Sequence, residues 1–327
     1  QMLGLGVVAP ALAIPLLEAC GKPAASASKL ATVRLGYQTN IWGMPLVVAI
    51  SSKYFHGVPL QQTQVTSGNK TRDLMVAGQV DMGTFAAHTF IVGAAKGQLQ
   101  TVCVVADVGK TLSMLSQKSI TSVPQLKGKK IGFQPGASST VIAQQKVLPS
   151  FGLKTGDYQT VNVDQSNLVS ALAAHSIDAY GGAVEPYGAM VVSQGLGTKL
   201  VTFEKYDLLP VLLCVRPQFA KANHATVVAM VEGMLRVQKL FQSNHGKVVD
   251  IVQQFYNSHN FNLSKSIIEN AIGEVKVNVG ITPELTTYLQ GVAQSELKLG
   301  HISSLPDINT VLPKTYLAEA SKNLNGG

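Results

Sequence analysis

Polar side chains stand at the ends of several predicted strands. After the strands predicted at 32–37, 60–66 and 80–83 come, in order, Gln38, Thr39, Asn40 and Trp42, then Ser67 and Gly68, then Thr84 and Ala86. Ligands of open α/β sheets bind beyond the carboxyl ends of the strands. We therefore expect these residues to contact a ligand. Trp42 is the only tryptophan and either forms a flat wall for an apolar group or packs within its loop.

A second candidate site follows the strand predicted at 129–134. Ser138, Ser139 and Thr140 come after Gly136 and lead into a helix predicted at 141–148. The free N–H groups and the dipole at the start of a helix favour an anion. The alternative is ordinary N-capping by the hydroxyl groups.

The sequence offers little that would support catalysis or metal binding. It contains no G-x-S-x-G elbow, phosphate-binding loop or paired acid–base motif. No Cys/His spacing suggests a metal site, and Cys103 and Cys214 lie in apolar, strand-like runs, which favours buried free thiols over a disulfide. The histidines are scattered, at positions His56, His88, His175, His224, His245, His259 and His301. We expect no enzyme activity, no cofactor and no metal.

An internal repeat organises the elements that position these residues. Residues 74–90 and 171–187 align at a constant offset of 97, which places Asp81 on Asp178. Each copy reads as a helix end, a turn, a short strand opened by aspartate and a small-residue loop that enters another helix. Two copies indicate two similar lobes rather than a solenoid. Strands and helices alternate from residue 32 onward, which predicts mostly parallel sheets.

Length and composition agree with two packed lobes. The chain has 327 residues, of which 46% are hydrophobic and 13% charged, and its net charge is +8. The basic residues are scattered, so no nucleic-acid partner is expected. We predict a first lobe at 32–108 plus 216–327 and a second lobe at 109–215. The lobes would be joined by crossings near 105–109 and 214–217, with a helical tail packed on the first lobe.

The first 31 residues are predicted to be an export segment and a tether. Residues 1–19 are apolar with one charge, as in the core of a secretory signal. Residues 17–21, LEACG, resemble a bacterial lipobox in which Cys20 would be lipidated, although Glu18 departs from the pattern. Cleavage after residues 25–27 is the alternative. Residues 22–31 would form a flexible tether.

Six segments, taken in their order along the chain, carry a family resemblance. They are VRLGYQ, PLVVAISSKYF, VTSGNKTRDLMVAGQVDMGT, SVPQLKGKKIGFQPGASST, FGLKTGDYQTVNVD and ALAAHSIDAYGGAVEPY. Together they resemble substrate-binding proteins of ABC importers of the nitrate/sulfonate/taurine type, which are also similar to thiamine-pyrimidine binders. The resemblance implies an α/β, periplasmic-binding-protein-like type II fold. Such a fold has two α/β lobes, two crossover strands and a ligand in the cleft between the lobes.

The resemblance also places Glu185 and Tyr187 at the cleft, where they could contact an amine or hydroxyl of the ligand. The alternative for Glu185 is an ion pair with a surface lysine. A carboxylate facing the pocket would disfavour a bare anion such as nitrate, which favours an organic, anionic or zwitterionic or heteroaromatic ligand. The site would hold this ligand without a cofactor.

The implied function is that of an extracytoplasmic solute-binding protein. It would close on a small molecule by a hinge motion and deliver it to an ABC permease. A monomer suffices for this role, and a lipid at Cys20 would hold it at the outer face of the cytoplasmic membrane. The alternatives are an enzyme on the same fold, of the thiamine-pyrimidine or menaquinone biosynthesis type, and a ligand-sensing lobe.

Overall fold

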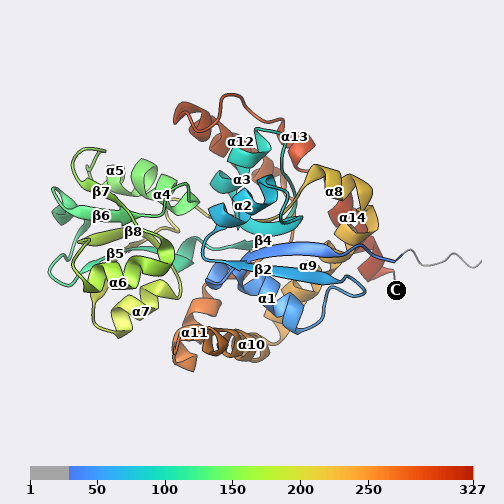
Figure 1. Ribbon diagram of the computed structural model, residues 1–327, viewed down its shortest axis with the longest axis horizontal. Coiled ribbons are helices and arrows are strands. Elements are labelled where there is room, and N and C mark those ends of the chain that lie inside the picture. The colour runs from blue at the N-terminus through green and yellow to red at the C-terminus, as the bar shows by residue number, and fades with distance from the viewer. Residues whose placement is uncertain (1–28, 327) are drawn as a thin grey trace, which may run out of the picture.

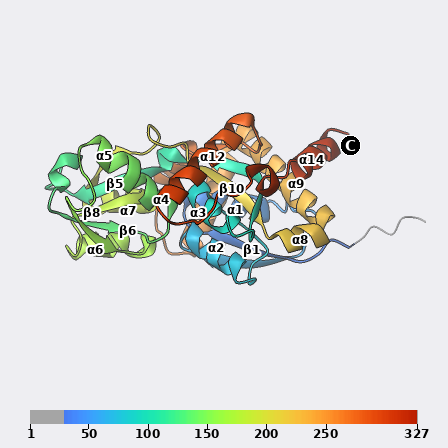
Figure 2. The ribbon, with the colours of Figure 1, turned by 90° about the horizontal axis from the view of Figure 1, so that it is seen from above.

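Two α/β lobes, each built on one mixed sheet, make up the protein, and the computed structural model describes residues 29–326 (Figure 1). The lobes lie side by side along the long axis, with lobe 2 at one end and the C-terminus at the other (Figure 2). The predicted signal-like segment with Cys20 lies outside the described residues, as does most of the tether. Within 29–326, no helix is long and apolar enough to cross a bilayer.

Lobe 1 contains a six-stranded sheet. Its strands, in spatial order, are β2 (Leu60–Val65), β1 (Val33–Gln38), β3 (Met82–Ala86), β10 (Pro210–Val215), β4 (Gln100–Asp107) and β11 (Lys276–Val277). β1 pairs in parallel with both β2 and β3, whereas β10 is antiparallel to β3 and β4. The two faces of the sheet carry separate apolar clusters, as expected from the alternation of side chains along a strand.

Lobe 2 repeats this arrangement with five strands. In spatial order they are β7 (Gln159–Asn162), β6 (Lys130–Phe133), β8 (Ala179–Val184), β5 (Leu112–Gln117) and β9 (Gly197–Thr202). β6 is parallel to β7 and β8, and β5 is antiparallel to β8 and β9. Each sheet therefore has a parallel core in which β1 lies between β2 and β3, or β6 between β7 and β8, and an antiparallel strand, β10 or β5, follows on one side.

The helices cover both faces of each sheet. In lobe 1 they are α1 (Met44–Ser51), α2 (Gly68–Val76), α3 (Ala87–Ala94), α8 (Pro217–Ala222), α9 (His224–Ser243), α10 (His245–Ser258), α11 (Lys265–Gly273), α12 (Pro283–Lys298), α13 (Ile308–Val311) and α14 (Thr315–Asn325). In lobe 2 they are α4 (Ser138–Ile142), a π-helical stretch (Ala143–Val147), α5 (Leu148–Ser150), α6 (Leu168–Ala173) and α7 (Tyr187–Ser193). α4, the π-helical stretch and α5 form one continuous helical run from 138 to 150. Short 3-10 turns lie at Ile41–Gly43, Gly109–Thr111, Val123–Leu126 and Gln165–Asn167.

The predicted two-lobed α/β fold is confirmed, and the helical tail packs on lobe 1, where α12 contacts α3 and α14 contacts α9. The prediction of mostly parallel sheets is wrong. The chain leaves lobe 1 after β4 and returns to it in β10, and these two strands pair antiparallel. In lobe 2 the chain enters in β5 and leaves after β9, and these two strands also pair antiparallel. β5 and β9 were not predicted as strands.

One predicted lobe boundary also needs correction. The prediction placed residues 210–215 in lobe 2, but β10 pairs with β3 and β4 in the sheet of lobe 1. The chain therefore returns to lobe 1 through residues 203–209, and the second crossing does not lie at 214–217. The first crossing follows β4, at residues 108–111, beside the predicted position.

The second crossing is held by a buried carboxylate. Asp207 accepts hydrogen bonds from Lys146 Nζ of lobe 2 at 2.6 Å, from the Tyr288 hydroxyl of α12 at 2.5 Å and from the Leu209 amide at 2.8 Å. The crossing is therefore tied to a helix of each lobe. Burial and the Asp207 charge raise the pKa of Tyr288 well above its ordinary value, which keeps this donor protonated.

Candidate functional site

The two lobes meet at the carboxyl ends of β1, β2 and β3, where the loops contact lobe 2 directly. The Ile41 amide donates to the Glu185 carbonyl at 2.8 Å. The indole Nε1 of Trp42 donates to Thr111 Oγ1 in the first crossing at 2.8 Å. Trp42 is 7% exposed and belongs to the larger apolar cluster. Its position therefore agrees with the packing alternative and ties the loop after β1 to the crossing.

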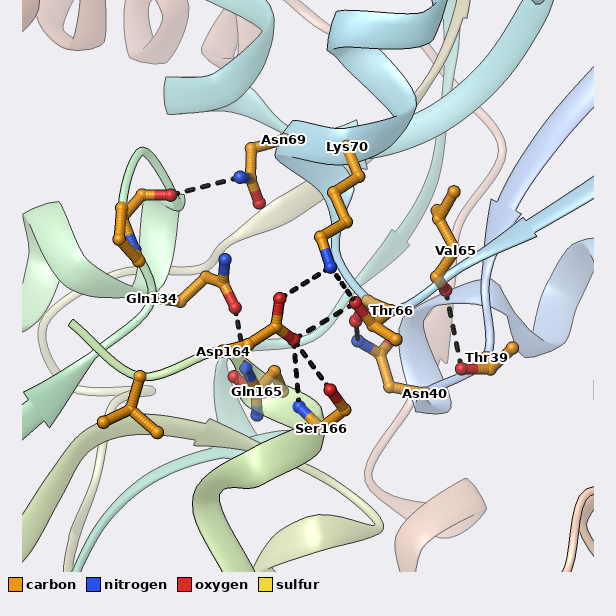
Figure 3. Close-up of polar contacts among 12 residues, drawn as sticks. Thr39, Asn40, Val65, Thr66, Asn69, Lys70, Gln134, Asp164, Gln165 and Ser166 are labelled. Carbon is orange, nitrogen blue, oxygen red and sulfur yellow. Dashed lines mark hydrogen bonds and ion pairs between the residues drawn. The ribbon is translucent and has the colours of Figure 1, made fainter. Parts of the chain in front are cut away.

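An ion pair joins the lobes at the rim of this junction (Figure 3). Lys70 Nζ at the start of α2 lies 2.6 Å from Asp164 Oδ2, which follows β7 in lobe 2. Thr66 Oγ1 donates to Asp164 Oδ1 at 3.2 Å, and the amide and hydroxyl of Ser166 donate to the same oxygen at 3.2 and 2.9 Å. Burial raises the pKa of Asp164, but the hydrogen bonds from Lys70 and Ser166 outweigh it and lower this pKa overall.

A second contact between the lobes involves the predicted serine-rich helix start. The Ser138 hydroxyl accepts a hydrogen bond from the Thr89 amide at 3.1 Å and lies 3.1 Å from the Thr89 hydroxyl. Thr89 is in the first turn of α3, whose own N-cap residue, Ala86, provides no side-chain cap. A serine of lobe 2 thus caps a helix of lobe 1.

The neighbours of Ser138 are engaged within lobe 2. Thr140 Oγ1 donates to the Gln134 carbonyl at 2.6 Å. Ser139 is 3% exposed and packs against Gly182, where an added Cβ would lie 2.8 Å from the Ser139 Cβ. Two of the three hydroxyl groups therefore already have protein partners, and the predicted anion-binding role of 138–140 remains a prediction.

Thr39 and Asn40 shape the loop after β1. The Thr39 amide donates to the Val65 carbonyl at 2.9 Å. Asn40 Oδ1 accepts from the Trp42 amide at 3.1 Å, which caps the 3-10 turn, and its Nδ2 lies 3.5 Å from the Thr66 carbonyl. The hydrogen bonds of Thr39 and Asn40 hold the loop against the end of β2. The backbone of this loop then faces lobe 2, where the Ile41 amide reaches Glu185.

Several buried polar atoms at the junction have no hydrogen-bond partner within residues 29–326. They are Gln38 Oε1, Ser67 Oγ, Asn69 Oδ1, Thr84 Oγ1 and Gln165 Nε2. Gln38 and Thr84 are 0% exposed, and Ser67 and Gln165 are 5% and 2% exposed. A buried polar atom without a partner costs about 1–3 kcal/mol, so such atoms are rare in native proteins. They are five of the fourteen such atoms among the described residues, and a group of them at a junction between two lobes is typical of a site completed by a ligand.

Glu185 and Tyr187 lie in lobe 2 at the same junction. The Glu185 carboxylate forms an ion pair with Lys199 and accepts from the Ala189 amide at 2.8 Å. This is the alternative of an ion pair with a surface lysine. The charge of Glu185 is thus compensated, and the argument that it disfavours a small anion no longer holds. Tyr187 packs edge-on against Phe261 with ring centroids 5.8 Å apart, and burial raises its pKa to about 12.

Sequence reasoning missed part of this junction. Lys70, Asp164 and Gln165 were not predicted. Asp164 and Gln165 follow the end of β7 after one intervening residue, so the rule of polar residues after strands would have found them. The pairing of Lys70 carried no such signal, because its partner Asp164 is 94 residues away in the other lobe.

Two cavities between the lobes flank the junction. The larger one, of about 580 Å³, lies between α7 and β9 of lobe 2 and α11 of lobe 1, and its walls include Thr111, Glu185 and Lys199. The smaller one, of about 220 Å³, lies between α4 of lobe 2 and α2, α3 and α12 of lobe 1, and includes Ser138 and His88. The described residues contain no group of three or more His, Cys, Asp or Glu placed to share a metal ion.

Comparisons with known proteins agree with this fold. The alkanesulfonate-binding protein SsuA of Xanthomonas axonopodis pv. citri, solved with MOPS bound, superposes with a TM-score of 0.74 at 19% identity and covers 90% of this chain and 99% of its own. The periplasmic nitrate-binding protein NrtA of Synechocystis PCC 6803 superposes with a TM-score of 0.73 at 14% identity, covering 91% and 90%. The predicted periplasmic-binding-protein fold is confirmed.

Similarity in sequence to known proteins extends over most of the chain. A protein of Brucella abortus (strain 2308), whose name proposes a binding role without a stated ligand, is 24% identical over 295 residues, which cover 87% of this chain and 89% of that protein. Residues 26–253 match the model of the NMT1-like family, and this stretch contains all of lobe 2 and most of the sheet of lobe 1. The chain therefore belongs to the NMT1-like family.

Proposed function

We propose that this protein is an extracytoplasmic solute-binding protein of an ABC importer. It takes up a small organic ligand between its lobes and presents the closed form to a membrane permease. The observation that carries this proposal is the set of buried, unpartnered polar atoms at the lobe junction, contributed by both lobes. A site divided between two lobes that are joined by two crossings is suited to closing around a ligand.

The relatives support the same role. Two proteins of this fold are described as binding alkanesulfonate and nitrate, and a third is described only as binding. We propose binding rather than catalysis, and export by the N-terminal segment. Lipidation of Cys20 would hold the protein near its permease, and a monomer would suffice. The crossings at 108–111 and 203–209 would act as the hinge.

Ligand capture can be tested without knowing the ligand. The purified protein is heated with and without the low-molecular-mass fraction of an extract of its source organism, and bound compounds are identified by mass spectrometry. A ligand at 100 times its Kd stabilises the folded state by about 2.7 kcal/mol, which a thermal-shift measurement resolves. We expect an increase in Tm and a decrease in the radius of gyration. A protein that gains no stability and retains no compound would speak against this function.

A further inference from the structure

We propose that the ligand presents an uncharged edge in which an N–H donor lies beside an oxygen acceptor, as in a carboxamide or lactam, and that Gln38 and the start of α2 bind this edge. The inference rests on the proposed function and specifies its ligand. It depends on which atoms of the lobe junction are already paired and which are free.

Gln38 supplies the strongest evidence. Its Nε2 donates to the Thr84 carbonyl at 2.9 Å, and its Oε1 has no partner among the described residues although Gln38 is 0% exposed. If the side-chain amide of Gln38 were turned over, its Oε1 would lie against the carbonyl oxygen of Thr84, and both are acceptors. The hydrogen bond to Thr84 therefore fixes Oε1 as the atom without a partner. The free atom is an acceptor. It requires an N–H or O–H donor, which ionised carboxylates and sulfonates and the nitrate ion do not have.

The start of α2 lies directly beside this amide. A Cβ added at Gly68 would lie 2.6 Å from Gln38 Nε2 and 2.7 Å from Phe85 Cβ, so only glycine lets the helix approach this closely. The N-cap residue Ser67 makes no side-chain cap, and its buried hydroxyl has no partner in the part of the chain that the structure describes. The amides of the first turn of a helix favour an acceptor oxygen. The side-chain amide of Gln38 and the first turn of α2 thus lie side by side.

The charges at the junction are already compensated. Lys70 is paired with Asp164, and Lys199 with Glu185. Neither of these lysines is free to balance an anionic ligand, and neither of these carboxylates is free to balance a cation. Desolvation of a charged ligand group would therefore be poorly repaid here. The unpaired groups Gln38, Ser67 and Thr84 are all neutral, which favours a neutral polar edge.

Matched probes test this chemistry on the unaltered protein. Isothermal titration calorimetry and ligand-observed NMR would compare benzamide, N,N-dimethylbenzamide, benzoate and benzenesulfonate, together with 2-pyrrolidinone, N-methyl-2-pyrrolidinone and nitrate. We expect the N–H-bearing amide and lactam to bind at least about tenfold more tightly than their N-methylated partners and the anions. Tighter binding of the anions, or equal binding of the methylated compounds, would overturn the inference.

A variant assigns the effect to Gln38. In Gln38→Met we expect the ratio of affinities for 2-pyrrolidinone and its N-methyl analogue to fall to about one, since the acceptor that selects the N–H is gone. Gln61→Met, an exposed position on the neighbouring strand β2, is the matched control and should keep the ratio. An unchanged ratio in Gln38→Met would contradict the role of Gln38. The probe comparison stands even if this variant does not fold.

The ligand recovered from the extract separates this inference from the proposed function. A recovered compound that has no N–H or O–H donor would overturn the inference and leave the solute-binding function standing. If neither the extract nor any probe binds, both are overturned. A recovered compound with an amide-type edge, bound less tightly by Gln38→Met, would support both.

Discussion

Asp81 and Asp178 occupy the same place in the two lobes but have different surroundings. Asp81 Oδ2 accepts from the backbone amide of Arg34 at 3.2 Å, and Asp178 Oδ2 accepts from that of Lys130 at 2.8 Å. In each lobe the aspartate amide donates back to the carbonyl of the same partner at 2.8 Å. Each carboxylate therefore sets the register of a parallel strand pair, β1 with β3 or β6 with β8.

Only Asp81 also binds guanidinium groups. Arg34 Nη2 lies 2.5 Å from its Oδ1, and Nη2 of Arg216, directly after β10, lies 2.6 Å from the same oxygen. We expect Asp81→Asn to lower the free energy of unfolding by roughly 2–3 kcal/mol, somewhat less than for fully buried pairs because both arginines are partly exposed. Asp178→Asn should cost less than about 1 kcal/mol. Equal losses in urea unfolding would contradict this account.

The effect of Asp81 should depend on pH. Burial raises the pKa of Asp81, but the hydrogen bonds from Arg34 and Arg216 lower it, and overall it lies below its ordinary value of 3.8. A carboxyl whose pKa is lower in the folded state stabilises the protein above its unfolded pKa and loses this effect as the pH falls through the folded one. The difference in unfolding free energy between wild type and Asp81→Asn should therefore stay constant from pH 7 to about pH 4 and narrow as the pH falls further.

The two described cysteines should be unreactive in the folded protein. Cys103 and Cys214 are free and 0% exposed, and burial raises the pKa of the Cys103 thiol to about 12. They lie on adjacent strands but in the apolar clusters of opposite sheet faces, so they cannot bond to each other without turning a strand over. Peptide mapping after iodoacetamide treatment should find both labelled only in denaturant. Labelling in native buffer would show that the sheet opens locally.

At the scale of elements, the cap on α3 comes from the other lobe. Because Ser138 and Thr89 separate when the lobes part, their hydrogen bonds should favour the closed form. We expect Ser138→Ala to shift the ligand-free protein toward open conformations by about 1 kcal/mol. Small-angle scattering would register this as a larger radius of gyration.

The control for this prediction lies in α6 of lobe 2. Ser170 Oγ donates to the Asn167 carbonyl at 2.9 Å, so this contact stays within one lobe. Ser170→Ala should leave the radius of gyration unchanged. If both variants expand the protein alike, the Ser138 hydroxyl has no specific part in closure.

At the scale of the whole molecule, the pair between Lys70 and Asp164 spans the two lobes. The Lys70 side chain is 45% exposed, so the pair should contribute only about 0.5–1 kcal/mol to closure. Lys70→Met should therefore weaken ligand binding about two- to fivefold at low salt, and the difference from wild type should shrink at high salt. Calorimetry with a recovered ligand measures both effects.

A matched ion pair within lobe 1 provides the comparison. Lys265 Nζ lies 2.6 Å from Asp250 Oδ1, between α11 and α10, and both side chains are more than half exposed. Lys265→Met removes the same charge and should leave ligand affinity unchanged. Equal weakening in both variants would point to net charge rather than to the pair between the lobes.

Local pattern predicted much of this fold. The repeat around Asp81 and Asp178 indicated two lobes, and the alternation of strands and helices located most of the elements to within a few residues. The strands β5 and β9 were missed because their sequences, LSMLSQ and GTKLVT, have mixed polarity. Their pairing partners lie far away in the chain, so local pattern says little about them.

The sequence by itself determined that the chain forms two α/β lobes, with polar side chains at the ends of their strands. Only the tertiary structure decided that β10 belongs to the sheet of lobe 1 and that Lys199 forms an ion pair with Glu185. It also decided that the Ser138 hydroxyl is hydrogen-bonded to Thr89, whereas Gln38 Oε1 has no partner among the described residues. The reason is physical. Periodicity and turn chemistry act between near neighbours, whereas the hydrogen bonds of a buried polar atom depend on segments that only folding brings together.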